Sequence, residues 1–192
     1  MRSASAIFRH AALLLSLTLV TAACPQKGGK LAPVAGGRAR VVSREDAGPS
    51  GAAQSEQGGV TVTAFGDWTA GGTDVSLEVH NTAAAPVSID FAGVALSGAG
   101  GRTARLNWVV EYVTRDGKLQ HVPVYNRAEK AGAGAPVLTV EPGARRSMQA
   151  GFVYEGADDR GGRLDERATL TVPLRGGAGE QSFEFVFLYA GR

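Results

Sequence analysis

Apolar and polar residues alternate with a period of two through most of the chain after residue 59. In the stretch 75–80, for example, every second residue is Val or Leu and those between are Ser, Glu and His. The same alternation recurs in 60–63, 87–91, 106–113, 137–140, 148–154, 170–174 and 183–189. It indicates β-strands with one buried and one solvated face. No window places apolar residues at helical spacing over three turns, so the pattern predicts an all-β fold.

Turn residues separate these strands at regular intervals. Asp116-Gly117 suits the two central positions of a two-residue hairpin, where φ is positive. Pro142-Gly143 suits a type II turn. Pro123 donates no backbone hydrogen bond, so its strand is expected at a sheet edge or beside a bulge.

Large aromatic side chains on two of the strands indicate how those strands are buried. The last places Phe183, Phe185, Phe187 and Tyr189 on one face, which predicts core because aromatic residues dominate core energetics. In 106–113, Leu106, Trp108, Val110 and Tyr112 share one face, and Val109 and Val113 lie on the other. This strand is therefore expected to be central or covered on both sides.

About eight short strands joined by turns are typical of an antiparallel two-sheet sandwich. The segments 75–82 (VSLEVHNT), 86–89 (PVSI) and 138–143 (LTVEPG), with Phe152 ten residues past Pro142, resemble the immunoglobulin-like domains found on many bacterial lipoproteins. The resemblance implies a single immunoglobulin-like β-sandwich over 59–192. It implies a fold and no activity, and no Cys pair flanks Trp108.

The first 24 residues have the three parts of a secretory signal peptide. Arg2 and Arg9 precede the apolar run 11–20, and the small residues 21–23 precede Cys24, the only cysteine. This ending resembles the lipobox of bacterial lipoproteins. The resemblance implies cleavage of residues 1–23 and attachment of fatty acyl groups such as palmitate to Cys24. The run is shorter than the roughly 20 residues of a membrane-spanning helix, although ordinary cleavage or retention remain alternatives.

Residues 24–58 form the expected link between lipid and domain. They are rich in Gly, Pro, Ala and Gln and lack a periodic apolar pattern, so they predict a flexible tether that holds the domain about 30 Å from the membrane. The formal charge of the whole chain is only +2, and two positive charges belong to the signal. Without a basic stripe, nucleic-acid binding is not expected.

A search for reactive groups singles out few residues. His80 and His121 alternate out of phase with the apolar residues of their strands, whereas Met148 is in phase. A shared copper site among the three is therefore a minor alternative to surface roles for the histidines. The acidic loop 158–166 lacks the spacing of a calcium loop, and its interspersed arginines favour a solvated charged segment.

We therefore expect a non-catalytic binding or structural module, anchored through lipid on Cys24, that holds another envelope protein by its loops or by the edge strand near Pro123. No cofactor and no metal site are expected. The alternatives are a periplasmic copper- or calcium-binding protein and an accessory subunit of a secretion or pilus apparatus. Pro25 after the lipidated cysteine favours the outer over the inner membrane, with the domain facing the periplasm.

Overall fold

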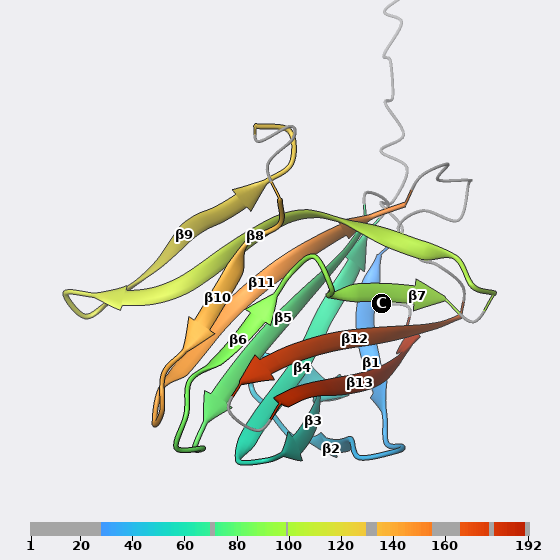
Figure 1. The fold of residues 1–192 in the computed structure, drawn as a ribbon. Coiled ribbons are helices and arrows are strands. Elements are labelled where there is room, and N and C mark those ends of the chain that lie inside the picture. The colour runs from blue at the N-terminus through green and yellow to red at the C-terminus, as the bar shows by residue number, and fades with distance from the viewer. Residues whose placement is uncertain are drawn as a thin grey trace, which may run out of the picture.

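The computed structural model describes residues 28–69, 72–98, 100–129, 134–154, 166–176 and 179–190. Within these ranges all strand pairings are antiparallel and no α-helix occurs, which confirms the all-β prediction (Figure 1). The strands are β1 (Gly29–Val34), β2 (Arg40–Val42), β3 (Ala52–Gln57), β4 (Val60–Thr69), β5 (Gly72–Asn81), β6 (Val87–Asp90), β7 (Ala95–Gly98), β8 (Thr103–Arg115), β9 (Lys118–Asn126), β10 (Val137–Val140), β11 (Arg145–Val153), β12 (Arg167–Gly176) and β13 (Gly179–Tyr189). A short 3₁₀ helix, η1 (Gly48–Ser50), lies between β2 and β3.

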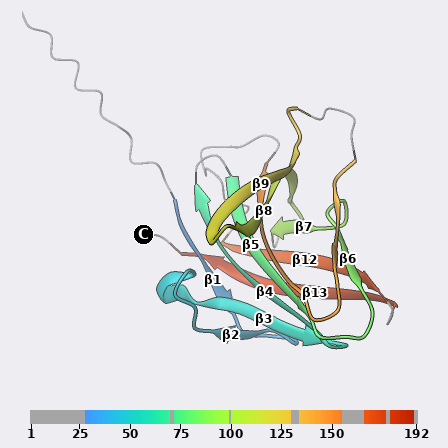
Figure 2. The same cartoon turned by 90° about the vertical axis from the view of Figure 1, so that its left-hand side faces the viewer.

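Eight of the strands close into a barrel. Their order is β1-β13-β12-β7-β8-β11-β5-β4, and β1 pairs again with β4 to complete the ring. Strands β3 and β2 extend the sheet outward beyond β4, β9 extends it beyond β8, and β6 joins β12 to β10. Figure 2, turned by 90°, shows β2 and β3 at one side of the barrel.

The immunoglobulin-like sandwich expected from the sequence is therefore not what forms. A sandwich keeps its two sheets apart, whereas here two strands change sheet. Strand β1 pairs with β4 through Gly29 and Lys30 and with β13 through residues 31–34. Strand β8 pairs with β7 at residues 103–104 and with β11 at residues 105–112. These two strands join the sheets at both edges, and the resulting barrel differs from the immunoglobulin fold.

The flexible tether expected over 24–58 is also wrong for its described part. Residues 29–57 contain β1, β2, β3 and η1, and the domain therefore begins near residue 29 rather than 59. Ala52, Ala53 and Ser55 are buried in β3 despite their small side chains. The segment is ordered because its backbone pairs with β4 and β13, which compensates for the weak apolar content. Residues 1–27, including Cys24, lie outside the described residues.

The hydrophobic core fills the interior of the barrel with side chains from strands on opposite sides of the ring. Phe183, Phe185 and Phe187 of β13 are fully buried, as the aromatic stripe predicted. They share one hydrophobic cluster with Val75, Leu77 and Val79 of β5 and with Met148, Ala150 and Phe152 of β11. In β8 the buried core residues are Ala104 and Val109, whereas Trp108 and Tyr112 alternate with Val109 and lie partly covered on the outer face.

The predicted turns are confirmed. Asp116 and Gly117 have φ values of 52° and 71°, and the hairpin brings Arg115 opposite Lys118. Gly143 has a φ of 74°, and the Ala144 amide donates to the Glu141 carbonyl at 3.0 Å. Among the described strands β9 pairs only with β8, and the register shifts opposite the Pro123–Tyr125 stretch, as expected of an edge strand with a bulge.

Candidate functional site

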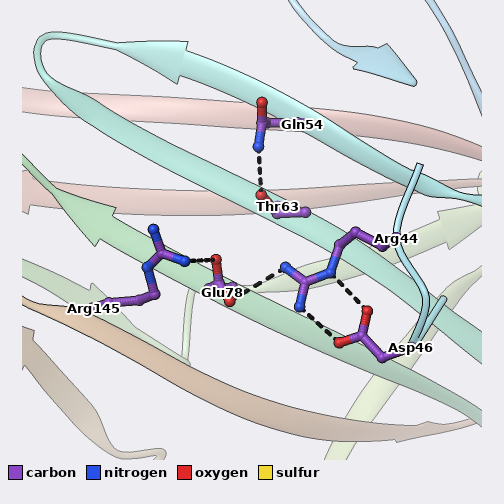
Figure 3. A network of polar contacts seen from close by, with 6 residues as sticks. All are labelled: Arg44, Asp46, Gln54, Thr63, Glu78 and Arg145. Atoms are coloured by element: carbon purple, nitrogen blue, oxygen red, sulfur yellow. Dashed lines mark hydrogen bonds and ion pairs between the residues drawn. The ribbon is translucent and has the colours of Figure 1, made fainter. Parts of the chain in front are cut away.

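The outer face of the sheet carries an ion-pair network that fixes the loop between β2 and β3. Figure 3 shows the Arg44 guanidinium donating two hydrogen bonds to the Asp46 carboxylate, from Nε to Oδ1 at 2.8 Å and from Nη2 to Oδ2 at 2.7 Å. Arg44 Nη1 also reaches Glu78 Oε2 of β5 at 3.2 Å, and the guanidinium carbon lies 5.2 Å from the centre of the Phe65 ring. Arg44 thus ties the loop to β4 and β5.

Glu78 is the centre of this network. Its second oxygen, Oε1, lies 3.2 Å from Arg145 Nη1 of β11, so one carboxylate links two arginines from segments about 100 residues apart in the chain (Figure 3). The Glu78 side chain is only 17% exposed, which reduces the screening of both ion pairs by water. Beside the network, Gln54 of β3 donates to Thr63 Oγ1 of β4 at 3.1 Å.

The ion pairs shift the pKa values of their members. The hydrogen bonds and charges of Asp46 and Glu78 raise the pKa of Arg44. The Arg44 hydrogen bonds hold the pKa of Asp46 below its usual range. Both shifts favour the charged forms of Arg44 and Asp46, as expected of two groups that form an ion pair with each other.

Two hollows flank the network. One, of about 410 Å³, lies between the Arg44 loop and the β8–β9 hairpin and is lined by residues including Phe65, Ser76, Glu78, Tyr112 and Leu119; we name it the outer cleft. The other, of about 470 Å³, lies on the β2–β3 side and is lined by residues including Arg40, Thr61, His80 and Arg145. The Arg44 and Glu78 side chains line both hollows.

The β8–β9 hairpin forms the far wall of the outer cleft. Tyr112 packs edge to face with His121 across the hairpin, with ring centres 4.6 Å apart, and its hydroxyl donates to Gln149 Oε1 of β11 at 2.8 Å. Burial and the nearby Asp74 carboxylate raise the pKa of Tyr112, so the phenol stays protonated and acts as a donor. Leu119, near the tip, is 64% exposed.

A second polar cluster lies at the end of the barrel where β1 begins. The hydroxyls of Thr73, Tyr154 and Tyr189 are within hydrogen-bond distance of one another, at 2.8, 3.0 and 3.3 Å. Burial raises the pKa of Tyr154 well above its usual range, so the phenol stays neutral. Trp68 packs on Tyr189 and donates to the Ala190 carbonyl at 3.0 Å. The three hydroxyls are hydrogen-bonded to one another, so the cluster stabilises this end of the barrel.

The histidines and methionine considered for copper do not meet. His80 lies half-buried on the outer face of β5, opposite Arg145, and His121 is exposed on β9. Met148 is fully buried in the core. The sheet therefore separates Met148 from both imidazoles. The described ranges contain no group of three or more His, Cys, Asp or Glu side chains placed to hold a metal ion.

The remaining expected site residues cannot be placed. Cys24 and most of the acidic loop, residues 158–165, lie outside the described residues. Nor does any described segment form a helix long and apolar enough to cross a bilayer.

The sequence did not single out the outer cleft. Glu78 alternates with the buried Leu77 and Val79, and Arg145 is out of phase with the buried Met148 and Ala150, which is enough to place each on an outer face. Their meeting depends on the pairing of β5 with β11, and the position of Arg44 depends on a loop with no periodic pattern. Only a prediction of strand order would have brought these three residues together.

Comparisons with known proteins add little to this geometry. Neither a protein-family model nor a curated protein matches the chain. A solved structure of a family 123 glycoside hydrolase from Clostridium perfringens is similar at 13% identity and a TM-score of 0.31, over 59% of this chain and 20% of that one. The chain thus spans about a fifth of that enzyme, and a similarity at this level bears on neither the fold nor the function.

Proposed function

We propose that this protein is a lipid-anchored, non-catalytic binding module of the bacterial cell envelope, held through acylated Cys24 and facing the periplasm. The signal-like segment 1–23, followed directly by Cys24, supports the anchor. The pairing of Arg44 with Asp46 and Glu78 supports a binding role rather than a reaction, because each of these side chains is engaged by a fixed ionic partner. The partner is another envelope protein.

The β8–β9 hairpin is the proposed binding surface. Its strand β9 has an outer edge with no paired strand among the described residues. Of the four exposed large apolar side chains described, Leu119 at its tip is the most exposed, at 64%, and it borders the outer cleft. An exposed apolar side chain beside a mixed polar cleft gives a partner both an anchor point and hydrogen-bonding groups. Pro123 and the bulge confine strand addition to the first half of β9.

Substituting Cys24 tests the anchor. Cys24→Ala removes the acylated thiol, so we expect the protein to move into the soluble fraction or to accumulate as unprocessed precursor, as followed by fractionation and by mass spectrometry of the N-terminus. Normal processing together with unchanged membrane fractionation would contradict the proposal.

Substituting Leu119 tests the binding surface. Leu119→Asp places a charge on the hairpin, and we expect at least a tenfold loss of the envelope protein recovered by cross-linking and co-purification, which corresponds to about 1.4 kcal/mol. Val137→Asp is the matched control, since Val137 is 59% exposed on β10, away from the outer cleft. Equal recovery with both variants would place the interface elsewhere.

A further inference from the structure

The distance between Cys24 and the first strand limits how the barrel can sit on a membrane. Strand β1 begins at Gly29, five residues after Cys24. A fully extended chain spans at most about 3.6 Å per residue, so these residues reach no more than about 18 Å. This is shorter than the reach expected of a 34-residue coil, because β1 to β3 have taken most of that segment into the fold.

The start of β1 also fixes which end of the barrel is near the anchor. Gly29 and Lys30 lie opposite Trp68 and Asp67, at the end of β4. We call this the anchor end; it also holds the Thr73, Tyr154 and Tyr189 hydroxyl cluster. In Figure 1 it is the upper end, where the arrow of β4 finishes.

The opposite end is formed by several turns. These join β3 to β4, β5 to β6 and β10 to β11, and they lie at the lower end in Figure 1. Backbone hydrogen bonds from Asn81 to Ala144 and from Gly143 to Asn81 hold two of them together. The ends are well separated, since the ten residues of β4 span roughly 30 Å at about 3.3 Å each.

We infer that the anchor end faces the lipid headgroups and that the turn end points away from the membrane. This inference rests on the proposed acylation of Cys24. A tether shorter than the barrel allows the molecule to tilt but prevents it from inverting. Lys30 pairs with Asp67 at 2.8 Å, and Asp74 lies directly opposite Asp67, so these three side chains offer no net positive charge to anionic lipid. The short chain, rather than electrostatic attraction, sets the orientation.

Energy transfer to labelled lipid measures this orientation. A donor fluorophore is attached through an encoded azide at Thr69, exposed at the anchor end, or at Glu141, exposed in the turn between β10 and β11. The protein from Cys24 onward contains every described strand, and Cys24 is its only thiol, so a maleimide lipid couples it to vesicles at that position. Coupling in vitro makes the measurement independent of whether cells acylate Cys24.

We expect transfer to headgroup-labelled acceptors to be severalfold greater from position 69 than from position 141. Inserting about 20 Gly and Ser residues after Gly28 lengthens the mean reach of the tether to roughly 27 Å and should largely abolish the difference. Equal transfer, or greater transfer from position 141, in the unmodified chain would overturn the inference. If the difference in transfer between positions 69 and 141 is as large in the lengthened chain, the short tether is not what orients the barrel.

Discussion

Asp74 and Asp46 have pKa values shifted in opposite directions. Asp67 and Asp74 face each other across β4 and β5, and like charges in such a pair oppose folding. Burial, with a contribution from the Asp67 charge, raises the pKa of Asp74. Asp46 is the reverse case, because its hydrogen bonds with Arg44 lower its pKa. Ionisation of Asp74 thus opposes folding, whereas ionisation of Asp46 favours it.

The opposite pKa shifts of Asp74 and Asp46 predict that Asp74→Asn and Asp46→Asn change stability in opposite directions. The raised pKa of Asp74 means that its ionisation opposes folding above that pKa, so Asp74→Asn should increase the free energy of unfolding at neutral pH. Asp46 contributes stability above its unfolded-state pKa of about 3.9 and loses it as the pH falls through its lower folded value, so Asp46→Asn should destabilise at neutral pH. Each effect should be below about 1 kcal/mol, because both side chains are partly exposed.

Urea unfolding of the two variants checks these predictions, at neutral pH and at a pH below the folded-state and unfolded-state pKa values of both aspartates. Each Asp is then protonated in the folded and unfolded states, so the differences from the unsubstituted protein should shrink towards zero at the lower pH. The same sign for both variants at neutral pH would show that the substitutions act through packing instead of charge.

At the scale of elements, the closure of the barrel depends on the close approach of β1 to its neighbours. A Cβ atom on Gly29 would lie 2.0 Å from the Ala190 carbonyl oxygen and 2.9 Å from Trp68 Nε1. These are the two atoms of the hydrogen bond that ties β4 to the end of β13. Only glycine lets β1 lie against this hydrogen bond without displacing backbone.

Gly29→Val should therefore destabilise the barrel by about 2–3 kcal/mol, since the contact is with backbone that cannot rotate away. Chemical unfolding followed by tryptophan emission measures the loss, because Trp68 is part of the contact. Gly36→Val is the matched control in the turn that follows β1, where an added Cβ meets nothing within 4 Å, and it should cost less than about 0.5 kcal/mol. A similar loss for both would contradict the steric role of Gly29.

The elements that could be predicted from sequence are those specified by local chemistry. Asp116-Gly117 and Pro142-Gly143 require particular backbone angles, and alternation in 75–80 requires one buried face, so these predictions hold. Strands β1 to β3 were missed because their buried residues are mainly Ala, Ser and Gly, without apolar alternation. Their order comes from pairing with β4 and β13, and Leu31 lies opposite Tyr189, more than 150 residues away in the chain. No local window contains that information, and for the same reason the sequence did not reveal the Arg44–Glu78–Arg145 network.

At the scale of the whole molecule, a closed ring leaves few strand edges exposed. Within the described part of the chain, the unpaired edges belong to the outlying strands β2, β9 and β10. The barrel strands β4 and β13 are both covered by β1, and β3 covers β4 further along. The segment that resembled a tether is thus the part that closes the fold.

A chain shortened to 59–192 should consequently fail to form a stable monomer. It retains the length expected of one domain but lacks β1, β2 and β3, so the edges of β4 and β13 are left open to other chains. We expect it to lose most of the roughly 5–15 kcal/mol that stabilises a domain and to associate, as measured by sedimentation and urea unfolding. A chain of residues 28–192 is the control and should be monomeric. A monomeric 59–192 chain with the same unfolding midpoint would show that closure is dispensable.

The double pairing of β1 also has a mechanical consequence. A force applied at residue 24 and resisted at the turn end of the barrel acts along β1, whose residues are hydrogen-bonded to β4 and β13. Such a force shears these bonds together, whereas a force across the strand would break them one after another. The strand nearest the attachment point is therefore loaded in the direction in which a β-sheet resists extension best, and tension on the N-terminal segment is shared between the two strands that flank β1.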